Sequence, residues 1–247
     1  MAAAGDIHAG VGDEERVREA IAEAAEQADL IVLAGDLTQH GQVDEIAVVA
    51  DACRELAVPV VCVLGNHDWQ SDRAADLSRA LVEAGVIVLE RSHTILSVNG
   101  ASVGVAGAKG FVGGFVNGWA NFGEPLFRAA YAETTRDVEG LEQALEAIEP
   151  CSVRIALLHY SPTEQTLAGE PERLWLVLGA ERLAGPIRAH RPDIVLHGHA
   201  HHGSFEGDVD GVPVYNVAVH VMGKAFWVFD LDAEQRAPQP PLRVAET

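Results

Sequence analysis

Apolar residues in the first 90 positions follow two alternating spacings. An apolar residue at every third or fourth position predicts an amphipathic helix, whereas a continuous apolar run predicts a strand buried on both faces. The segments with helical spacing are 13–28, 44–56 and 71–84. The apolar runs are 1–5, 30–34, 58–64 and 86–89. The repeating order of strand, loop and helix predicts an open α/β sheet.

Antiparallel β-structure is predicted from Thr94 onward. Segments 94–98 and 102–106 flank Asn99-Gly100, a dipeptide typical of the two-residue turn of a β-hairpin. A helix is expected at 141–148. The later segments with strand character are 153–158, 193–196, 204–208, 212–217 and 224–231.

Residues 109–127 fit neither spacing and are rich in glycine and aromatic residues. We expect them to form a lid or an ordered surface loop, within an irregular insert at about 109–137 of a single domain spanning 1–247. The aromatic residues of this stretch either line a substrate pocket or pack the loop onto the core; they are Phe111, Phe115, Trp119 and Phe122. Three prolines at 237–241 exclude a regular β-ladder, so this tail is expected to wrap the surface.

Composition favours a soluble protein of the reducing cytoplasm. Hydrophobic residues make up 48% of the chain, but no apolar run approaches the ~18 residues of a membrane span. Residues 1–5 have neither the basic segment nor the long apolar stretch of a secretory signal. Cys53, Cys62 and Cys151 are odd in number and contain no CxxC pair, which argues against a disulfide framework. We expect three small core side chains.

The formal net charge of −20 opposes long-range attraction to nucleic acid or to an anionic membrane, because such binding relies on clustered lysine and arginine. A small substrate is therefore favoured over a polymer. Two bound cations would still make the mouth of a metal site locally positive.

Five short blocks of polar residues follow predicted strands in a fixed order. They are Asp6-Ile7-His8, Gly35-Asp36, Gly65-Asn66-His67-Asp68, His159 and Gly198-His199-Ala200-His201. Carboxylate, imidazole and amide groups bind divalent cations, and open α/β sheets place their sites at the carboxyl ends of strands. An isolated Asp-x-His or Gly-Asp carries little information, but five blocks in order are far more specific. Together they predict one dinuclear hydrolytic site.

Two divalent metals ~3.5–4 Å apart can share a bridging water, lower its pKa and orient it toward a phosphate ester. Such a site needs a carboxylate that bridges both ions, and Asp36 is the candidate. Asp6 and His8 could chelate one ion from a single loop. The alternate positions of His199 and His201 suit two different ions. Nitrogen and oxygen ligands without thiolate favour two ions of manganese or iron, with zinc, nickel or cobalt as alternatives, over calcium.

The blocks resemble the D-x-H, GD, GNH[D/E], H and GHxH motifs of the calcineurin-like metallophosphoesterase superfamily, from Asp6 to His201. The resemblance implies an α/β fold, a four-layer α/β/β/α sandwich of two mixed β-sheets flanked by helices. It implies that the first metal is bound by Asp6, His8, Asp36 and His201. It implies that the second metal is bound by Asp36, Asn66, His159 and His199.

The same resemblance implies catalytic roles in the third block. His67 would face the scissile phosphate, stabilise its developing charge and act as a general acid toward the leaving oxygen. Asp68 would either orient His67 or anchor the loop. Relatives usually place more apolar residues before the first block, so the strand at 1–5 is expected to be short or to start upstream of Met1.

The sequence gives weaker evidence for placing the other histidines and the basic side chains at the site. His40, His197 and His202 lie beside the ligand blocks and either orient ligands or are ordinary surface or hydrogen-bonded residues. His93, His190 and His220 have no neighbouring block and are expected to be structural. No arginine lies inside a block, so a phosphate clamp would come from the insert; the candidates are Lys109, Arg128 and Arg136.

The favoured function is hydrolysis of a small phosphomonoester or phosphodiester, with a metal-bridging hydroxide as the nucleophile. A nuclease is the alternative within the same chemistry, although the acidic balance and the lack of a basic stripe count against it. A non-catalytic interaction scaffold is the third reading, and it would be marked by a decayed ligand set. The ligands do not distinguish a monoesterase from a diesterase and leave the oligomeric state open.

Overall fold

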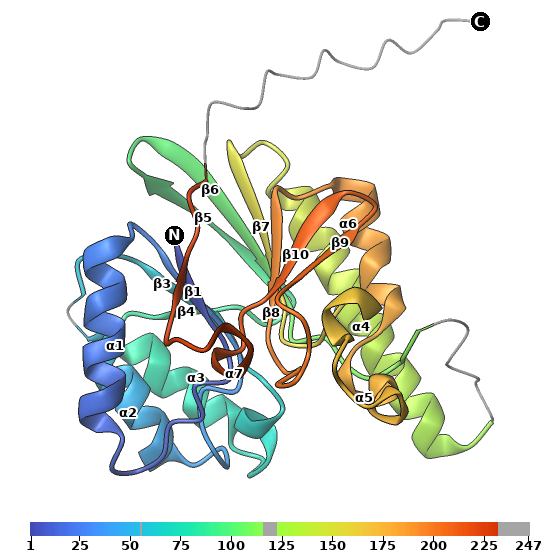
Figure 1. The fold of residues 1–247 in the computed structure, drawn as a ribbon, viewed down its shortest axis with the longest axis horizontal. Helices are drawn as coiled ribbons and strands as arrows, with labels where there is room; N and C mark the ends of the chain where they lie inside the picture. The colour runs from blue at the N-terminus through green and yellow to red at the C-terminus, as the bar shows by residue number, and fades with distance from the viewer. Residues whose placement is uncertain (55, 116–122, 232–247) are drawn as a thin grey trace, which may run out of the picture.

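Two β-sheets lie face to face in the middle of the molecule (Figure 1). The structure is a computed structural model and describes residues 1–54, 56–115 and 123–231. The first sheet has the order β11 (Trp227–Val228), β1 (Ala2–Ala4), β2 (Ile31–Ala34), β3 (Val60–Val63) and β4 (Ile87–Val88). The second has the order β5 (Ser92–Val98), β6 (Ala101–Gly107), β7 (Val153–Leu157), β8 (Ile194–His197), β10 (Val212–Asn216) and β9 (Glu206–Val209).

Both sheets are mixed. Strands β1, β2, β3 and β4 run parallel, and β11 joins β1 antiparallel. In the second sheet β6, β7, β8 and β10 run parallel, while β5 and β9 form antiparallel edges. The hairpin predicted around Asn99-Gly100 is β5–β6, and both residues adopt the positive φ that this turn requires.

Helices cover the outer face of each sheet (Figure 1). The first sheet is covered by α1 (Glu14–Gln27), α2 (Val43–Cys53) and α3 (Ala74–Glu83), and the second by α4 (Pro125–Ala147) and α6 (Ala184–His190). Strand β2 shows how one apolar run serves two layers: Ile31 and Leu33 pack toward the helices, whereas Val32 packs between the sheets. The predicted four-layer α/β/β/α sandwich is confirmed.

Shorter elements lie in the connections. They are η1 (His67–Trp69), η2 (Glu164–Leu167), η3 (Glu172–Leu174), α5 (Trp175–Leu178), η4 (Glu181–Leu183) and α7 (Val219–Met222). Within the described residues, no helix has both the length and the apolar character needed to cross a bilayer.

Helix α4 is much longer than the helix predicted at 141–148, because it begins at Pro125 inside the expected insert. Pro125 occupies the first turn, where its missing N–H costs nothing. The buried stripe of the early part of α4 carries Thr134, Asp137 and Gly140 rather than large apolar residues. Because these buried residues are not large and apolar, the sequence lacks the regular apolar spacing that would predict a helix here.

The strand predicted at 224–231 was wrong in extent. Only Trp227 and Val228 pair with β1, because β1 itself offers three residues, and the chain before them forms α7. The proline-rich tail at 237–241 lies outside the described residues.

Candidate metal centre

The ligand blocks follow the carboxyl ends of β1, β2, β3, β7 and β8, which meet at one edge of the two sheets. Four of these residues have left-handed backbones: φ is 58° at Asp6, 45° at His8, 51° at Asp36 and 70° at His199. Non-glycine residues seldom adopt this conformation, and it concentrates at functional sites. The loops therefore turn sharply enough to aim successive side chains into one space.

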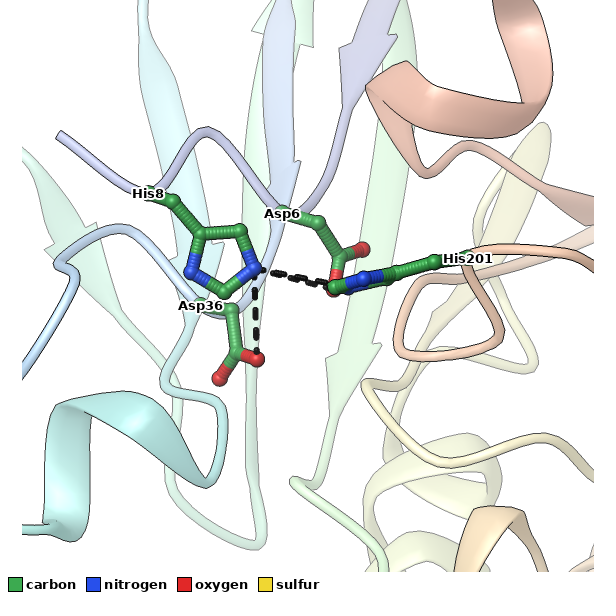
Figure 2. A group of neighbouring side chains, drawn as sticks. All are labelled: Asp6, His8, Asp36 and His201. Carbon is green, nitrogen blue, oxygen red and sulfur yellow. Dashed lines mark hydrogen bonds and ion pairs between the residues drawn. The ribbon is translucent and has the colours of Figure 1, made fainter. Parts of the chain in front are cut away.

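The first cluster brings together Asp6, His8, Asp36 and His201, whose candidate ligand atoms all lie within 4.8 Å of one another (Figure 2). His201 Nε2 lies 2.9 Å from Asp6 Oδ1 and 3.4 Å from His8 Nε2. His8 Nε2 lies 3.9 Å from Asp36 Oδ2. Two carboxylates and two imidazoles thus converge as the resemblance implies for the first ion.

The second cluster brings together Asp36, His159 and His199 within the same 4.8 Å limit. His159 Nε2 lies 3.3 Å from Asp36 Oδ1 and 2.9 Å from Asn66 Oδ1. The amide oxygen of Asn66 therefore joins this cluster. All seven predicted metal ligands lie in one of the two groups, and Asp36 belongs to both.

Asp36 presents one oxygen to each cluster. Its Oδ1 accepts a hydrogen bond from the His67 backbone N–H at 2.8 Å and faces His159. Its Oδ2 is buried and accepts no hydrogen bond from the described residues. A buried carboxylate oxygen without a donor is costly unless a cation neutralises it, so the residues present fit a metal ion at this position.

Backbone carbonyls fix the orientation of three imidazoles. His159 Nδ1 donates to the Ala34 carbonyl at 2.8 Å, and His199 Nε2 donates to the Val177 carbonyl at 3.0 Å. His67 Nδ1 donates to the Gln39 carbonyl at 2.6 Å. Each bond sets a tautomer and leaves the other ring nitrogen free to face the cluster, as in metal sites whose ligands are held by outer hydrogen bonds.

Opposite charges shift the titration of the carboxylates and two of the histidines. Burial would raise the pKa of Asp36, but the charge of His159 and its hydrogen bond outweigh burial and hold the pKa below its ordinary value. Burial lowers the pKa of His159, yet Asp36 and Asp6 raise it to about 9. The hydrogen bond with Asp6 likewise raises the pKa of His201. Without cations, the carboxylates therefore favour the protonated form of both imidazoles.

Two other imidazoles are held neutral. Burial and the charge of His159 lower the pKa of His199 to about 3, and burial lowers the pKa of His8. Neutral imidazole is the form that binds metals. Before a metal binds, the centre therefore combines carboxylates with two imidazoles whose pKa is raised, His159 and His201, and two whose pKa is lowered, His8 and His199.

Three motif glycines allow the ligands to approach closely. A Cβ on Gly65 would overlap Asp36 Oδ1, and one on Gly198 would overlap Asp6 Oδ2. Gly35 has a φ of +82°, and a Cβ there would lie 2.7 Å from His159 Nδ1. The sequence motifs contain these glycines because any side chain would displace a predicted ligand.

The two predicted catalytic residues differ in their surroundings. His67 is partly exposed, and its ring lies 4.5 Å from that of His8, with Nε2 4.0 Å from Asp36 Oδ2. Asp68 is fully buried, and its oxygens accept hydrogen bonds from the backbone of Leu37, Thr38 and Gly65. This arrangement favours the interpretation that Asp68 anchors the loop, since its partners among the described residues are loop groups rather than the His67 ring.

The neighbouring histidines make contacts of their own. His197 is buried and bonds to the Gly198 carbonyl and to Thr166, while His40 bonds to Glu45. His202 has an exposed side chain, and its backbone N–H donates to Glu170. The side-chain partners lie outside the two clusters: Glu45 is in α2, Thr166 is in η2 and Glu170 is in the loop after η2.

Of the phosphate-clamp candidates, Lys109 lies beside the second cluster, where its carbonyl accepts the His159 backbone N–H at 3.0 Å, whereas the two arginines bond to residues outside the clusters. Lys109 is buried, and its Nζ lies 4.7 Å from the centroid of the Phe111 ring and 5.3 Å from that of Tyr160. Arg128 donates to the Gly123 carbonyl, and Arg136 pairs with Glu133.

The aromatic residues of the insert that can be placed are in packing positions. Phe111 packs against the core of the second sheet, and Phe115 packs with Leu167, Leu178 and Ala200. Trp119 and Phe122 lie outside the described residues. Phe111 therefore serves packing, whereas Phe115 both packs on the core and lines a surface pocket with Pro162 and Thr163.

His220 was expected to be structural, but it lies at the centre. Its ring stacks on His201, with centroids 4.3 Å apart and an interplanar angle of 16°. No motif identifies it. The available signal was its place shortly after the predicted strand at 212–217, the same position relative to a strand as the five ligand blocks.

Comparisons with known proteins agree with this architecture. The sequence model of the calcineurin-like phosphoesterases matches residues 1–203. No curated protein shows a significant match. The structure resembles phosphopantetheinyl hydrolase from Mycobacterium tuberculosis with a TM-score of 0.70 and 18% identity, over 96% of this chain and 98% of that one.

Two further solved structures also resemble it. A putative 5′-nucleotidase from Staphylococcus aureus gives a TM-score of 0.54 and 17% identity, over 87% and 47% of the two chains. The protein TT1561 of Thermus thermophilus gives a TM-score of 0.53 and 21% identity, over 87% of each chain. At these identities the structures show a shared fold alone.

Proposed function

Because the chain belongs to the calcineurin-like phosphoesterase family, we propose that it is a dinuclear metal-dependent phosphohydrolase acting on a small phosphomonoester or phosphodiester. The observation that carries the proposal is the position of Asp36, whose two oxygens face two separate ligand clusters while Oδ2 has no hydrogen-bond donor among the described residues. A carboxylate so placed can bridge two cations.

Each cluster would bind one metal ion. Asp6, His8, Asp36 and His201 would hold one ion, and Asp36, Asn66, His159 and His199 the other. When bound, two such cations lower the pKa of a shared water, so that hydroxide is available near neutral pH, and they offset charge on the phosphoryl group. The nitrogen and oxygen donors favour manganese or iron, with zinc, nickel or cobalt as alternatives.

His67 is the group placed to touch the substrate. The Gln39 carbonyl holds its Nδ1 as a donor, so Nε2 points toward the clusters, 4.0 Å from Asp36 Oδ2. From there the imidazole can stabilise charge on a phosphoryl oxygen or deliver a proton to the leaving oxygen. Asp68 supports this role indirectly by fixing the loop that carries His67.

The test is hydrolysis of an aryl phosphate ester by manganese-loaded protein, compared with His67→Ala and Asp36→Asn. Both variants are expected to lose most turnover, and Asp36→Asn should also lose metal in elemental analysis. Activity near that of the unmodified protein in either variant would refute the proposal. Paired monoesters and diesters should then be screened, with a phosphopantetheinyl ester and a 5′-nucleotide included because two of the similar structures carry those names.

Charge and ligand content weigh against the two other functions. The net charge of −20 disfavours a nuclease, whose binding would require a basic surface. A scaffold would have lost ligands, whereas all seven predicted metal ligands and His67 are present. We also propose a cytoplasmic location, because Cys53, Cys62 and Cys151 are buried free thiols, as expected in a reducing compartment.

A further inference from the structure

His220 lies against two residues of the first cluster. Its ring stacks on His201 and meets the His8 ring at 6.0 Å with an interplanar angle of 64°. The side chain is exposed, so this imidazole stands between the cluster and solvent. The His8 ring is also contacted by His67, at 4.5 Å. Two imidazoles outside the predicted ligand set therefore contact the same ligand.

The backbone fixes the position of His220. Helix α7 starts where Val219 N–H donates to the Gly5 carbonyl at 3.1 Å, and Gly5 N–H donates to the Val217 carbonyl at 2.7 Å. Gly5 immediately precedes Asp6, so the helix is attached to the loop that carries two predicted ligands. Gly223, with a φ of +65°, ends the helix after one turn.

The ring nitrogens of His220 differ from those of the oriented imidazoles. His67, His159 and His199 each bond to a backbone carbonyl. Neither nitrogen of His220 makes a hydrogen bond to any residue that the structure describes. The stack on His201 thus holds the ring in place while leaving both of its polar atoms free for a ligand.

We propose that His220 is a substrate-contacting residue that donates a hydrogen bond to an oxygen of the substrate phosphoryl group beside His8 and His201. This inference rests on the proposed function, because it assigns a residue to the same phosphate-ester site. His220 is exposed whereas His8 and His201 are half-buried, so a phosphate that reaches these two residues from solvent would meet His220 beside their rings. His220 would recognise the negatively charged phosphoryl group: its ring N–H would bond to one oxygen, while the cations would neutralise charge on the others.

Three substitutions separate hydrogen bonding from stacking. His220→Phe retains an aromatic ring against His201 but has no N–H, His220→Ala removes both, and His220→Gln retains an N–H donor. Manganese-loaded proteins would be compared in KM and kcat for an aryl phosphate ester, in inhibition by inorganic phosphate, and in metal content. His93→Ala is the matched control, since His93 is an exposed histidine on β5, away from the clusters.

We expect His220→Ala and His220→Phe to weaken phosphate binding and raise KM roughly tenfold, the effect of losing one hydrogen bond to a charged group. His220→Gln should recover part of the loss, and metal content should be unchanged in all three. Normal phosphate binding by His220→Phe would overturn the proposal, because the ring would then serve only to support His201. Loss of metal in His220→Phe would also overturn it. If the unmodified protein hydrolyses no ester, the proposed function itself fails, whereas a selective effect on phosphate binding tests His220 alone.

Discussion

The carboxylate of Asp68 accepts two hydrogen bonds from Thr38, one from the backbone N–H at 2.9 Å and one from the hydroxyl at 2.7 Å. It also accepts backbone bonds from Leu37 at 3.2 Å and from Gly65 at 2.8 Å. Burial and the charge of Asp36 raise the pKa of Asp68, while these bonds oppose the shift. One buried side chain therefore joins the loop after β2 to the loop after β3.

Replacement of Asp68 by alanine should destabilise the fold. Three buried N–H groups would lose their acceptor, at about 1–3 kcal/mol each, so we expect the free energy of unfolding to fall by at least about 3 kcal/mol. Thr38→Val is the control, because it removes only the hydroxyl, which donates to Asp68 and accepts from the Gly41 N–H, and it should cost about 2 kcal/mol. Urea unfolding of the metal-free proteins measures both, and an equal or smaller loss in Asp68→Ala would contradict the anchoring role.

Gly198→Ala should weaken metal binding. The new methyl group would overlap Asp6 Oδ2, so the carboxylate that is bonded to His201 through Oδ1 must move. Displacement of a ligand by its surroundings typically costs roughly tenfold to a hundredfold in metal affinity. Calorimetric titration with Mn²⁺ would measure the loss. Gly185→Ala is the matched control, because no atom lies within 4 Å of the position of its Cβ; equal affinities in the two variants would exclude this explanation of the motif glycine.

Strand ends could be predicted from the sequence because parallel strands buried on both faces are continuous apolar runs. The run at 30–34 fixes Asp36 at the edge of the sheet, and the same rule places Asn66 and His159. The predicted ligand set therefore needed only the local sequence and the family pattern.

Features that depend on distant contacts could not be predicted. The first half of α4 is hidden because its buried face carries Asp137, which pairs with Arg91 at 2.7 Å, and Thr134, which donates to the Val112 carbonyl. The carbonyl of Val177 orients His199 across 22 positions of the chain. These contacts join residues far apart in the chain, so the local spacing of apolar residues does not reveal them.

Metal affinity should rise with pH because a proton occupies the second cluster. The pKa of His159 is raised to about 9 by Asp36 and Asp6, against the lowering effect of burial, so His159 is protonated at neutral pH in the metal-free protein. A cation must displace this proton, which gives roughly a tenfold gain in affinity per pH unit up to about 9. Calorimetry with Mn²⁺ in buffers of different ionisation enthalpy would count the protons released; a dissociation constant that is the same at pH 6.5 and 8.5 would contradict the prediction.

The same proton should make the stability of the metal-free protein depend on pH. A histidine whose folded pKa lies above its unfolded value of 6.5 stabilises the fold fully below pH 6.5. That contribution is lost as pH rises toward about 9. With a chelator present, the midpoint temperature of thermal unfolding should therefore fall between pH 6.5 and about pH 9. Saturating Mn²⁺ should remove this fall in the midpoint. A midpoint that rises over this range without metal would show that another group dominates.

Lys109→Met should leave both stability and phosphate binding nearly unchanged. The ammonium group is buried among the rings of Trp69, Phe111 and Tyr160, and within the described part of the chain it donates one hydrogen bond, to the Gly110 carbonyl at 3.2 Å. Burial lowers its pKa, while Asp137 opposes that shift, so the charged form gains little from the fold. Methionine fills a similar volume and also packs well against aromatic rings.

We therefore expect the free energy of unfolding of Lys109→Met at pH 7 to lie within about 1 kcal/mol of the unmodified protein, since an incompletely paired buried charge can be replaced by an apolar group at little cost. Lys224→Met is the control, because Lys224 is exposed and lies 3.7 Å from the centroid of the Trp227 ring. Inhibition by inorganic phosphate should also stay within about twofold, because the lysine faces the rings. A tenfold loss of phosphate affinity would instead identify Lys109 as the phosphate clamp and place its ammonium at the substrate.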